Sequence, residues 1–332
     1  MRNIKKIISL VLSISLVFTL FACSKNQSTD NNANTGSGNK AVVKITLASG
    51  GTSGTYYGFS GVVAQRLNET LKDKLKINVV STGASKANVQ MIDSNDAQIA
   101  IVQNDVMSYA YNATDMFTGE KPINTFSAIA SCYPESVQII SNKSITDISD
   151  LRGKKVSVGD AGSGVEFNAK QILEAYDIDI EKDIVKNNQS FADSCDSLKN
   201  GTLDAAFVTA GHPTVAVTEL SSNYDFNVLS IDDEHADKLI EKYGFYTKLN
   251  ITKDTYSVMK DDIQTVAVMA TYIANNNLPE DTVYEFVKSL FKEAGNFNHQ
   301  KAELLDPKTG VSGISIPFHP GALKYYKEFG LK

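Results

Sequence analysis

The chain has 332 residues, a formal net charge of −6 at pH 7 and 42% hydrophobic residues. This length is sufficient for two lobes that each bury a core of their own. The acidic balance and the lack of a basic cluster interleaved with aromatic residues argue against nucleic acid as a partner.

The first residues have the pattern of a secretory signal. Three basic residues among the first six precede 15 uncharged residues, 7–21, and the segment ends in Leu-Phe-Ala-Cys. That stretch is short for a transmembrane helix, and Cys23 occupies the position that a lipobox acylates. We therefore expect a lipoprotein signal peptide at residues 1–22 and a lipid anchor on Cys23, which would hold the chain on the outer face of the cell membrane. An uncleaved signal anchor is the alternative. Loss of the signal would change the formal charge to −9.

Residues 24–40 read SKNQSTDNNANTGSGNK, with a single apolar side chain. A segment of this composition has nothing to bury, so residues 23–40 are expected to form a disordered tether.

From residue 41 the chain alternates short apolar segments with segments of helical periodicity, which predicts an α/β protein with mostly parallel sheets. A strand–glycine turn–helix unit occurs in both halves. We expect lobe I at 41–130 plus 276–332 and lobe II at 131–275, joined by a hinge of two crossovers that opens and closes a cleft. Strands are expected at residues 42–48, 77–80, 99–102, 137–140, 155–158, 205–208 and 266–273.

Small and hydroxyl-bearing residues gather in three turns that follow expected strands and precede expected helices, at 50–57, 81–85 and 160–164. Glycine lets the backbone approach a ligand closely, and helix N-termini favour negative charge. Three such turns could hold a carboxylate from both lobes. Each turn alone is also ordinary turn chemistry. Ser163, for instance, forms a capping-box pattern with Glu166.

Arginine is scarce. The chain holds Arg2, Arg66 and Arg152 against 29 lysines, and neither of the last two has the setting of a bidentate carboxylate clamp. If the ligand is an anion, backbone N–H groups and hydroxyls should recognise it. Replacing Arg66 and Arg152 together should then leave the affinity nearly unchanged.

Catalytic and metal sites find little support. The four histidines are far apart in the sequence, and the glycine turns match neither a nucleophile elbow, a P-loop nor a dinucleotide fingerprint. We expect no enzyme activity, no cofactor and no metal. Cys132 and Cys195 could form a disulfide, but two free buried thiols are the simpler interpretation.

Several sequence blocks resemble a known family. GGTSGTYYGFSGVVAQRL, STGASKANVQMIDSNDAQIAIVQNDV, YPESVQIISNKSITDISDLRGKKVSVGDAGSG, LDAAFVTAGHP and HPGALKYYKEFG are similar, in this order, to the TAXI family of TRAP-transporter solute receptors, which are NMT1-like proteins. The resemblance implies a type II periplasmic-binding-protein fold, a permease partner driven by an ion gradient, and ligands among glutamate-like amino acids or C4 and C5 dicarboxylates.

The resemblance and the turns together give a set of expected ligand-binding residues. Glu135 stands out in this set, because an acid beside an anion site suits a ligand that also carries an ammonium group. One of the two adjacent tyrosines is expected to pack inward and the other to face the cleft. The set is Thr52, Ser53, Thr55, Tyr56, Tyr57, Thr82, Ser85, Asn88, Gln103, Glu135, Gly162, Ser163, Gly164 and His212.

These observations predict a lipid-anchored receptor that captures a small anionic metabolite between two lobes and delivers it to TRAP-type permease subunits. A lipoprotein that presents its closed state to a membrane signalling receptor would have nearly the same sequence and is the alternative.

Overall fold

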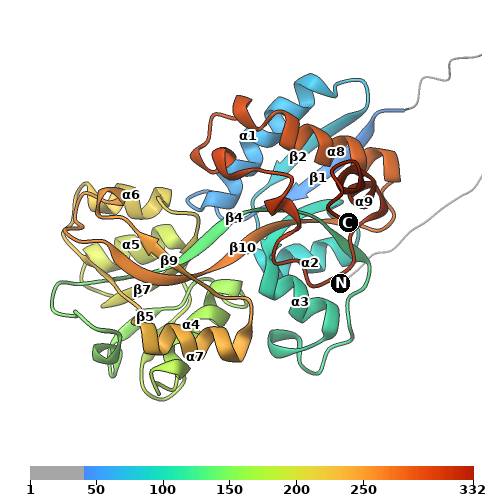
Figure 1. Ribbon diagram of the computed structural model, residues 1–332. Coiled ribbons are helices and arrows are strands. Elements are labelled where there is room, and N and C mark those ends of the chain that lie inside the picture. The colour runs from blue at the N-terminus through green and yellow to red at the C-terminus, as the bar shows by residue number, and fades with distance from the viewer. Residues whose placement is uncertain (1–40) are drawn as a thin grey trace, which may run out of the picture. The chain divides into compact units, whose positions relative to one another are not determined.

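The structure is a computed structural model that describes residues 41–332. The predicted signal peptide, Cys23 and the predicted tether lie outside the described residues. The described chain is an α/β protein built on one curled ten-stranded sheet (Figure 1). Its main strand order is β2-β1-β3-β10-β4-β7-β5-β6, with β8 beside β4 and β9 beside β10.

Lobe I is built around the β2-β1-β3 side of the sheet. Its helices cover both faces, and the parallel β1–β2 pair is in register from Val43↔Leu75 to Ala48↔Val80. The elements are β1 (Val43–Ala48), α1 (Thr55–Thr70), β2 (Leu75–Val80), α2 (Ser85–Asp93), β3 (Ile99–Gln103), α3 (Asn104–Asn112), α8 (Glu280–Lys292) and α9 (Pro320–Lys327).

Lobe II is built around the β7-β5-β6 side. Side chains at the helix starts cap three of its helices: Ser163 accepts from the N–H of Glu166 in α4, Ser190 from the N–H of Asp193 in α5, and Asp232 from the N–H of His235 in α7. The elements are β5 (Lys155–Ser157), α4 (Gly164–Ala175), β6 (Val185–Asn187), α5 (Phe191–Lys199), β7 (Ala205–Ala210), α6 (Val215–Ser221), β8 (Asn227–Leu229), α7 (Asp233–Tyr243) and β9 (Thr247–Ile251).

Two long antiparallel strands run through both lobes, β4 (Phe126–Ser141) and β10 (Ile263–Asn275) (Figure 1). Strand β10 pairs with β9 over Ile263–Ala267 and with β3 over Ala270–Ala274, so it changes lobes near Met269. The expectation of mostly parallel sheets was therefore wrong. Four strand pairs are parallel, but β4 and β10 pair antiparallel with all their neighbours because each passes from one lobe to the other.

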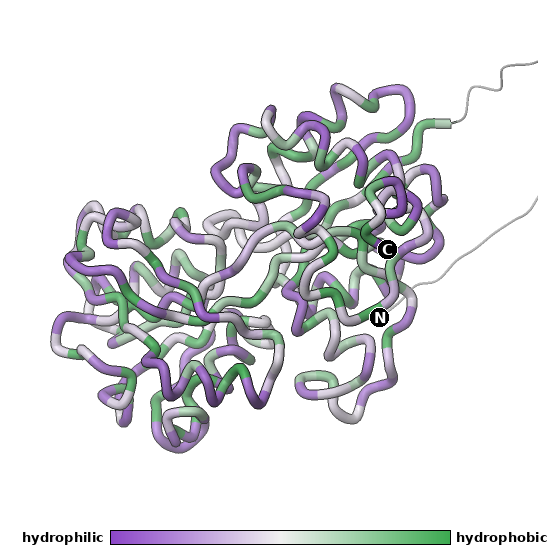
Figure 2. Tube along the Cα trace, in the orientation of Figure 1, coloured by the Kyte–Doolittle hydropathy of each residue, from purple (hydrophilic) through white to green (hydrophobic). Residues whose placement is uncertain are grey.

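Buried apolar side chains form two clusters in each lobe. Figure 2 shows the hydrophobic segments of the chain concentrated along the strands inside the lobes. In lobe I one cluster includes Phe59 and Phe286, and another includes Phe117. In lobe II the two clusters include Phe207 and Phe226. Each lobe thus has a core of its own, as the chain length predicts.

Short 3-10 helices connect the larger elements, at Asp115–Phe117, Ile148–Leu151, Lys253–Thr255, Ala294–Asn296, Gln300–Leu304 and Thr309–Val311. Cys132 and Cys195 are buried and free. Within residues 41–332, no helix has the length and apolar character needed to cross a membrane.

Candidate functional site

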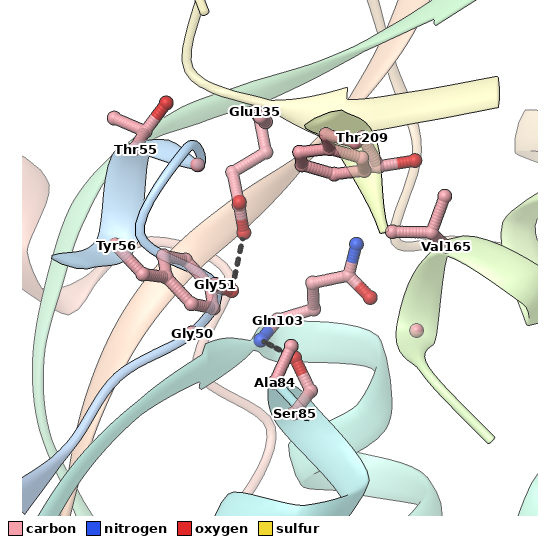
Figure 3. A pocket seen from close by; sticks show the side chains of 14 residues that line it. Gly50, Gly51, Thr55, Tyr56, Ala84, Ser85, Gln103, Glu135, Val165 and Thr209 are labelled. Atoms are coloured by element: carbon pink, nitrogen blue, oxygen red, sulfur yellow. Dashed lines mark hydrogen bonds between the residues drawn. The ribbon is translucent and has the colours of Figure 1, made fainter. Parts of the chain in front are cut away.

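A small cavity of about 50 Å³ lies where the N-termini of α1, α2 and α4 approach the middle of β4 (Figure 3). This space holds a few water molecules or part of a small metabolite. Both lobes contribute to its wall, and so does each of the three glycine turns singled out in the sequence. The lining residues are Gly50, Gly51, Gly54, Thr55, Tyr56, Ala84, Ser85, Gln103, Glu135, Gly164, Val165, Phe191, Thr209 and Ala210.

Helix starts give the wall unpaired backbone donors. The first N–H groups of a helix have no partner within the helix, and the partial positive charge of the helix dipole is concentrated there. The N-cap residues of α1 and α2, Gly54 and Ala84, provide no side-chain cap. Neither does Gln103, the N-cap of α3. The N-termini of α1 and α2 therefore keep donors for an anion or for water, whereas in α3 the N–H of Val106 donates to Asp105 Oδ1 over 2.8 Å.

The turn before α2 carries backbone strain at the cavity wall. Ala84 has φ 67° and ψ −147°, a region that glycine occupies readily and alanine rarely. Two side chains hold this turn in place: the Thr82 hydroxyl donates to Asn88 Oδ1 over 2.6 Å, and Asn88 Nδ2 donates to the Ser49 carbonyl over 2.6 Å. Thr82 and Asn88 thus shape the wall from behind without lining the cavity.

An acid and a phenol face each other on the lobe I side of the cavity (Figure 3). Tyr56 donates its hydroxyl hydrogen to Glu135 Oε2 over 2.6 Å, and Glu135 is only 2% exposed. Burial raises the pKa of Glu135 well above its ordinary value, which the hydrogen bond from Tyr56 only partly offsets. The cavity therefore favours the protonated acid, and a positive charge that enters it would favour the carboxylate.

Gln103 joins the two lobes at the cavity floor. Its Nε2 donates to Asn168 Oδ1 of α4 over 2.9 Å, while its Oε1 is buried without a hydrogen-bond partner. The N-terminus of α4 approaches so closely that a Cβ on Gly164 would lie 1.5 Å from this Oε1. An orphaned buried acceptor costs free energy, so this atom marks the place for a donor on a ligand or on water.

Asp105 extends this contact between lobes. Asn168 Nδ2 donates to Asp105 Oδ2 over 3.0 Å and to the Tyr246 hydroxyl over 2.9 Å. Burial raises the pKa of Asp105 to about 6. The network is a buried polar seam that holds α3 against α4.

The sequence profile of the NMT1-like family matches residues 47–330, almost all of the described chain. The chain belongs to the NMT1-like family.

Solved structures show the same fold at low sequence identity. The protein titled as a periplasmic transporter is 15% identical with a TM-score of 0.52, and the match covers 87% of this chain and 92% of that one. PhnD1 from Prochlorococcus marinus (MIT 9301), solved with methylphosphonate, is 10% identical with a TM-score of 0.50 and coverages of 87% and 99%. A protein from Bordetella bronchiseptica RB50 is 13% identical with a TM-score of 0.50 and coverages of 87% and 83%. The fold of this NMT1-like chain is the type II periplasmic-binding-protein fold, with two lobes and two connecting strands.

Six of the expected ligand-binding residues line the cavity of this NMT1-like chain, and they come from five separate elements. Sequence reasoning missed Thr209, whose Oγ1 is buried without a partner, and Phe191, whose ring lies 3.5 Å from the Cβ position of Gly54 across the cavity. The expected residues that line the cavity are Thr55, Tyr56, Ser85, Gln103, Glu135 and Gly164.

The remaining expected residues lie close by but outside the lining. Thr52 is exposed, Ser53 accepts a backbone hydrogen bond from Ala216 of lobe II, and the side of α1 that carries Tyr57 faces solvent, with Tyr57 36% exposed. The sequence predicted that one of these tyrosines packs inward and the other faces the cleft. In the structure Tyr56 is buried and also lines the cavity, whereas Tyr57 does neither.

Lobe II places its other expected residues similarly. Gly162 and Ser163 line a separate surface hollow with Lys86 and Lys186, and Ser163 caps α4. His212 lies behind the wall, with Nδ1 2.9 Å from Ser136 Oγ. Ligand contact by these residues stays a prediction.

Neither described arginine reaches the cavity. Arg66 Nε pairs with Glu293 over 2.8 Å, and Arg152 pairs with Asp183 over 2.7 Å. Replacing both should change ligand affinity less than about twofold, since exposed pairs contribute little to a distant site. Isothermal titration of the double variant checks this, and a hundredfold loss would contradict recognition without arginine.

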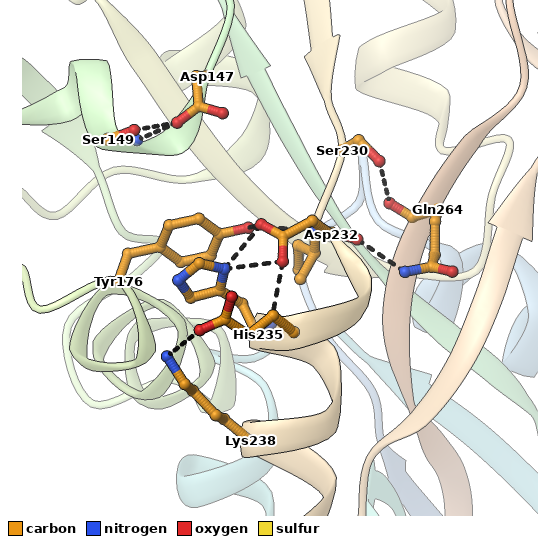
Figure 4. A network of polar contacts seen from close by, with 10 residues as sticks. Asp147, Ser149, Tyr176, Ser230, Asp232, His235, Lys238 and Gln264 are labelled. Atoms are coloured by element: carbon orange, nitrogen blue, oxygen red, sulfur yellow. Dashed lines mark hydrogen bonds and ion pairs between the residues drawn. The ribbon is translucent and has the colours of Figure 1, made fainter.

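A histidine–aspartate pair lies far from the cavity, at the start of α7 (Figure 4). His235 Nδ1 is 2.7 Å from Asp232 Oδ2, and the imidazole stacks on Tyr176 with ring centres 3.6 Å apart. Asp232 also caps α7 by accepting from the N–H of His235, and the Tyr176 hydroxyl donates to it over 2.9 Å. The pair fastens α7 to the end of α4, which is a structural role. Residues 41–332 contain no group of three histidine, cysteine or acidic side chains suited to a metal ion.

Proposed function

We propose that this chain is a solute-binding receptor whose ligand is a small carboxylate with an ammonium group, an amino acid of the glutamate type. The observation that carries this proposal is the two-sided chemistry of the cavity. The cavity combines N–H donors at the uncapped starts of α1 and α2 with acceptors at Glu135 and the orphaned Gln103 Oε1.

Each side suits one charge of an amino acid. A carboxylate gains from helix N-termini and from the hydroxyl of Ser85, which accepts from the N–H of Gln103 and can donate its own hydrogen to a ligand. An ammonium group donates three hydrogen bonds, which match Glu135 and Gln103 Oε1. A dicarboxylate brings no donor to Gln103 Oε1 and would leave this acceptor unpaired. The amino acid is therefore the better fit of the two ligand classes.

Binding involves no bond-making in this proposal. The ligand bridges the lobes, and closure is stabilised by contacts that exist only when the lobes meet, such as Gln103 to Asn168. Micromolar affinity requires about 8 kcal/mol net. A few charge-assisted hydrogen bonds in an enclosed cavity supply that amount after the costs of ordering.

The transport partner follows from the sequence blocks shared with the TAXI family. The closed receptor would deliver its ligand to TRAP-type permease subunits powered by an ion gradient, and lipid on Cys23 would keep it at the outer face of the membrane. Lobe boundaries at 130/131 and 275/276 belong to the same proposal. The NMT1-like family match and the type II periplasmic-binding-protein fold support the receptor role.

Titration calorimetry with L-glutamate in buffers of different ionisation enthalpy tests the ligand class. The empty cavity favours protonated Glu135, and an incoming ammonium group favours the carboxylate, so about one proton should be released per ligand. The Glu135→Gln variant is the control and should release none on any residual binding. Tight binding of succinate, or glutamate binding without proton release in the unmodified protein, would overturn the proposed ligand class.

A further inference from the structure

The 3-10 helix at Gln300–Leu304 carries a buried lysine that none of the roles described above uses. Lys301 is 8% exposed, and within the described residues its ammonium forms no ion pair. Some lysines of the described residues pair with acids, as Lys74 does with Glu285 over 2.7 Å. Burial lowers the pKa of Lys301, so a negative charge placed near this side chain would stabilise its ammonium.

The end of Lys301 lies directly behind the wall of the ligand cavity. A Cβ built on Gly211 would be 2.9 Å from Lys301 Cε, 3.0 Å from Thr55 Cγ2 and 3.1 Å from Tyr133 Cε2. Thr55 lines the cavity and donates its hydroxyl hydrogen to the Gly211 carbonyl over 2.7 Å. Gly211 also directly follows the lining residue Ala210. Lysine, threonine and tyrosine thus converge on one glycine at the boundary between the lobes.

The groups around this ammonium do not neutralise it. Burial, followed by the charge of Lys301, lowers the pKa of His212 to about 4 and lowers that of His299, so both imidazoles are neutral at pH 7. The Tyr133 hydroxyl is buried without a hydrogen-bond partner. Burial alone lowers the pKa of Lys301, and no acid raises it. A positive charge therefore lies close to the cavity with no negative group to balance it in the empty protein.

We propose that Lys301 is the counter-charge for an anionic ligand, acting through the wall formed by Thr55 and Gly211 instead of by direct contact. This inference rests on the proposed function, because it assumes that the occupant of the cavity is an anion. No arginine reaches the cavity, so the sequence did not indicate a positive charge for an anionic ligand. This proposal assigns that charge to Lys301, in the C-terminal part of the chain. Lys301 is a positioning residue, since its charge sets the potential in the cavity.

The test compares two ligands of nearly equal size and different charge. L-glutamate carries a net charge of −1, and L-glutamine carries none. In Lys301→Met the glutamate affinity should fall about tenfold or more, because a unit charge acts over about 10 Å at an effective dielectric constant of about 20. The glutamine affinity should change less than about twofold. Lys74→Met removes the same formal charge from an exposed site and should leave the preference for glutamate unchanged.

Two further measurements separate charge from structure. Lys301→Arg keeps the charge and should keep the preference for glutamate, and Lys301→Gln replaces the methionine variant if that one does not fold. In the ligand-free neutral variant, NMR titration should show His212 and His299 accepting protons at higher pH than in the unmodified protein. The proposed role of Lys301 as a counter-charge would be overturned if the neutral variant lost the same affinity for both amino acids. It would also be overturned if that variant kept the glutamate affinity, or the histidine titrations, of the unmodified protein. Failure of the unmodified protein to bind either amino acid would instead overturn the proposed function together with it.

Discussion

Replacing Gly164 with alanine should weaken ligand binding by blocking closure. Gly164 starts α4 in lobe II and faces Gln103 of lobe I. An added Cβ would lie 1.5 Å from Gln103 Oε1, 2.6 Å from Gln103 Cδ and 3.0 Å from Val106 Cγ2. Gln103 is 2% exposed and its Nε2 donates to Asn168, so it cannot turn away without breaking that bond.

The magnitude follows from that hydrogen bond. Leaving buried donors and acceptors unpaired costs about 1–3 kcal/mol. Gln103 and Gly164 belong to different lobes, so the cost falls on the closed arrangement and hardly on an open one. The dissociation constant should therefore rise about 5- to 150-fold, while the free energy of unfolding without ligand should change little.

Calorimetric titration with L-glutamate gives the affinity, and urea unfolding of the ligand-free protein gives the stability. Gly61→Ala is the matched control, because an added Cβ at this position of α1 has nothing within 4 Å. That control should bind normally and gain about 0.5–1 kcal/mol, as alanine favours a helix over glycine. An affinity of Gly164→Ala within twofold of the unmodified protein would show that the contact between Gln103 and α4 has no part in ligand binding.

Two further predictions concern stability. Tyr56→Phe removes the donor to buried Glu135 and should lower the free energy of unfolding, measured in urea, by about 1–3 kcal/mol. The control Tyr57→Phe changes an exposed residue of the same helix and should lower it by less than about 0.5 kcal/mol. Equal effects of the two substitutions would contradict a stabilising hydrogen bond between Tyr56 and Glu135. Because burial raises the pKa of Asp105 to about 6, the folded protein binds more protons than the unfolded chain between about pH 4 and 6, so stability should fall by about 2 kcal/mol as pH rises through this window. Asp105→Asn should flatten that dependence in urea melts at pH 4.5 and 7, and an identical slope would refute the assignment.

Much of the fold is visible in the sequence because its signals are local. The strands at 42–48, 77–80 and 99–102 are apolar, and glycine turns follow the first two, so their order along the chain predicts the ligand edge of lobe I. Strand β4 was only partly predicted. The part of β4 before the predicted residues 137–140 contains Ser131, Pro134 and Glu135, which interrupt an apolar pattern, and proline argues against a central strand.

The site was predicted where residue type carries information. The glycines and hydroxyl-bearing residues of the three turns, and Gln103 at the end of an apolar strand, could be recognised as candidate site residues from the sequence around each of them. Phe191 has the spacing of a core aromatic, and Thr209 is one polar residue in a buried strand, so only the packing of the lobes reveals that they share a cavity. Lys301 is one of 29 lysines and lies in a segment without periodicity. Its burial depends on elements distant in the sequence.

The position of Glu135 has a consequence for engineering. This acid lies on β4, paired with Val268 of β10, and β4 and β10 are the two strands that link the lobes. A ligand that binds Glu135 would therefore contact one of the strands that connect the lobes as well as the lining of the cavity. If Glu135 contacts the ligand as proposed, substitutions at this residue should alter selectivity and the ease of domain movement together, so a biosensor built from this chain should take its new specificity from Phe191 or Thr209 and leave the connecting strand unchanged.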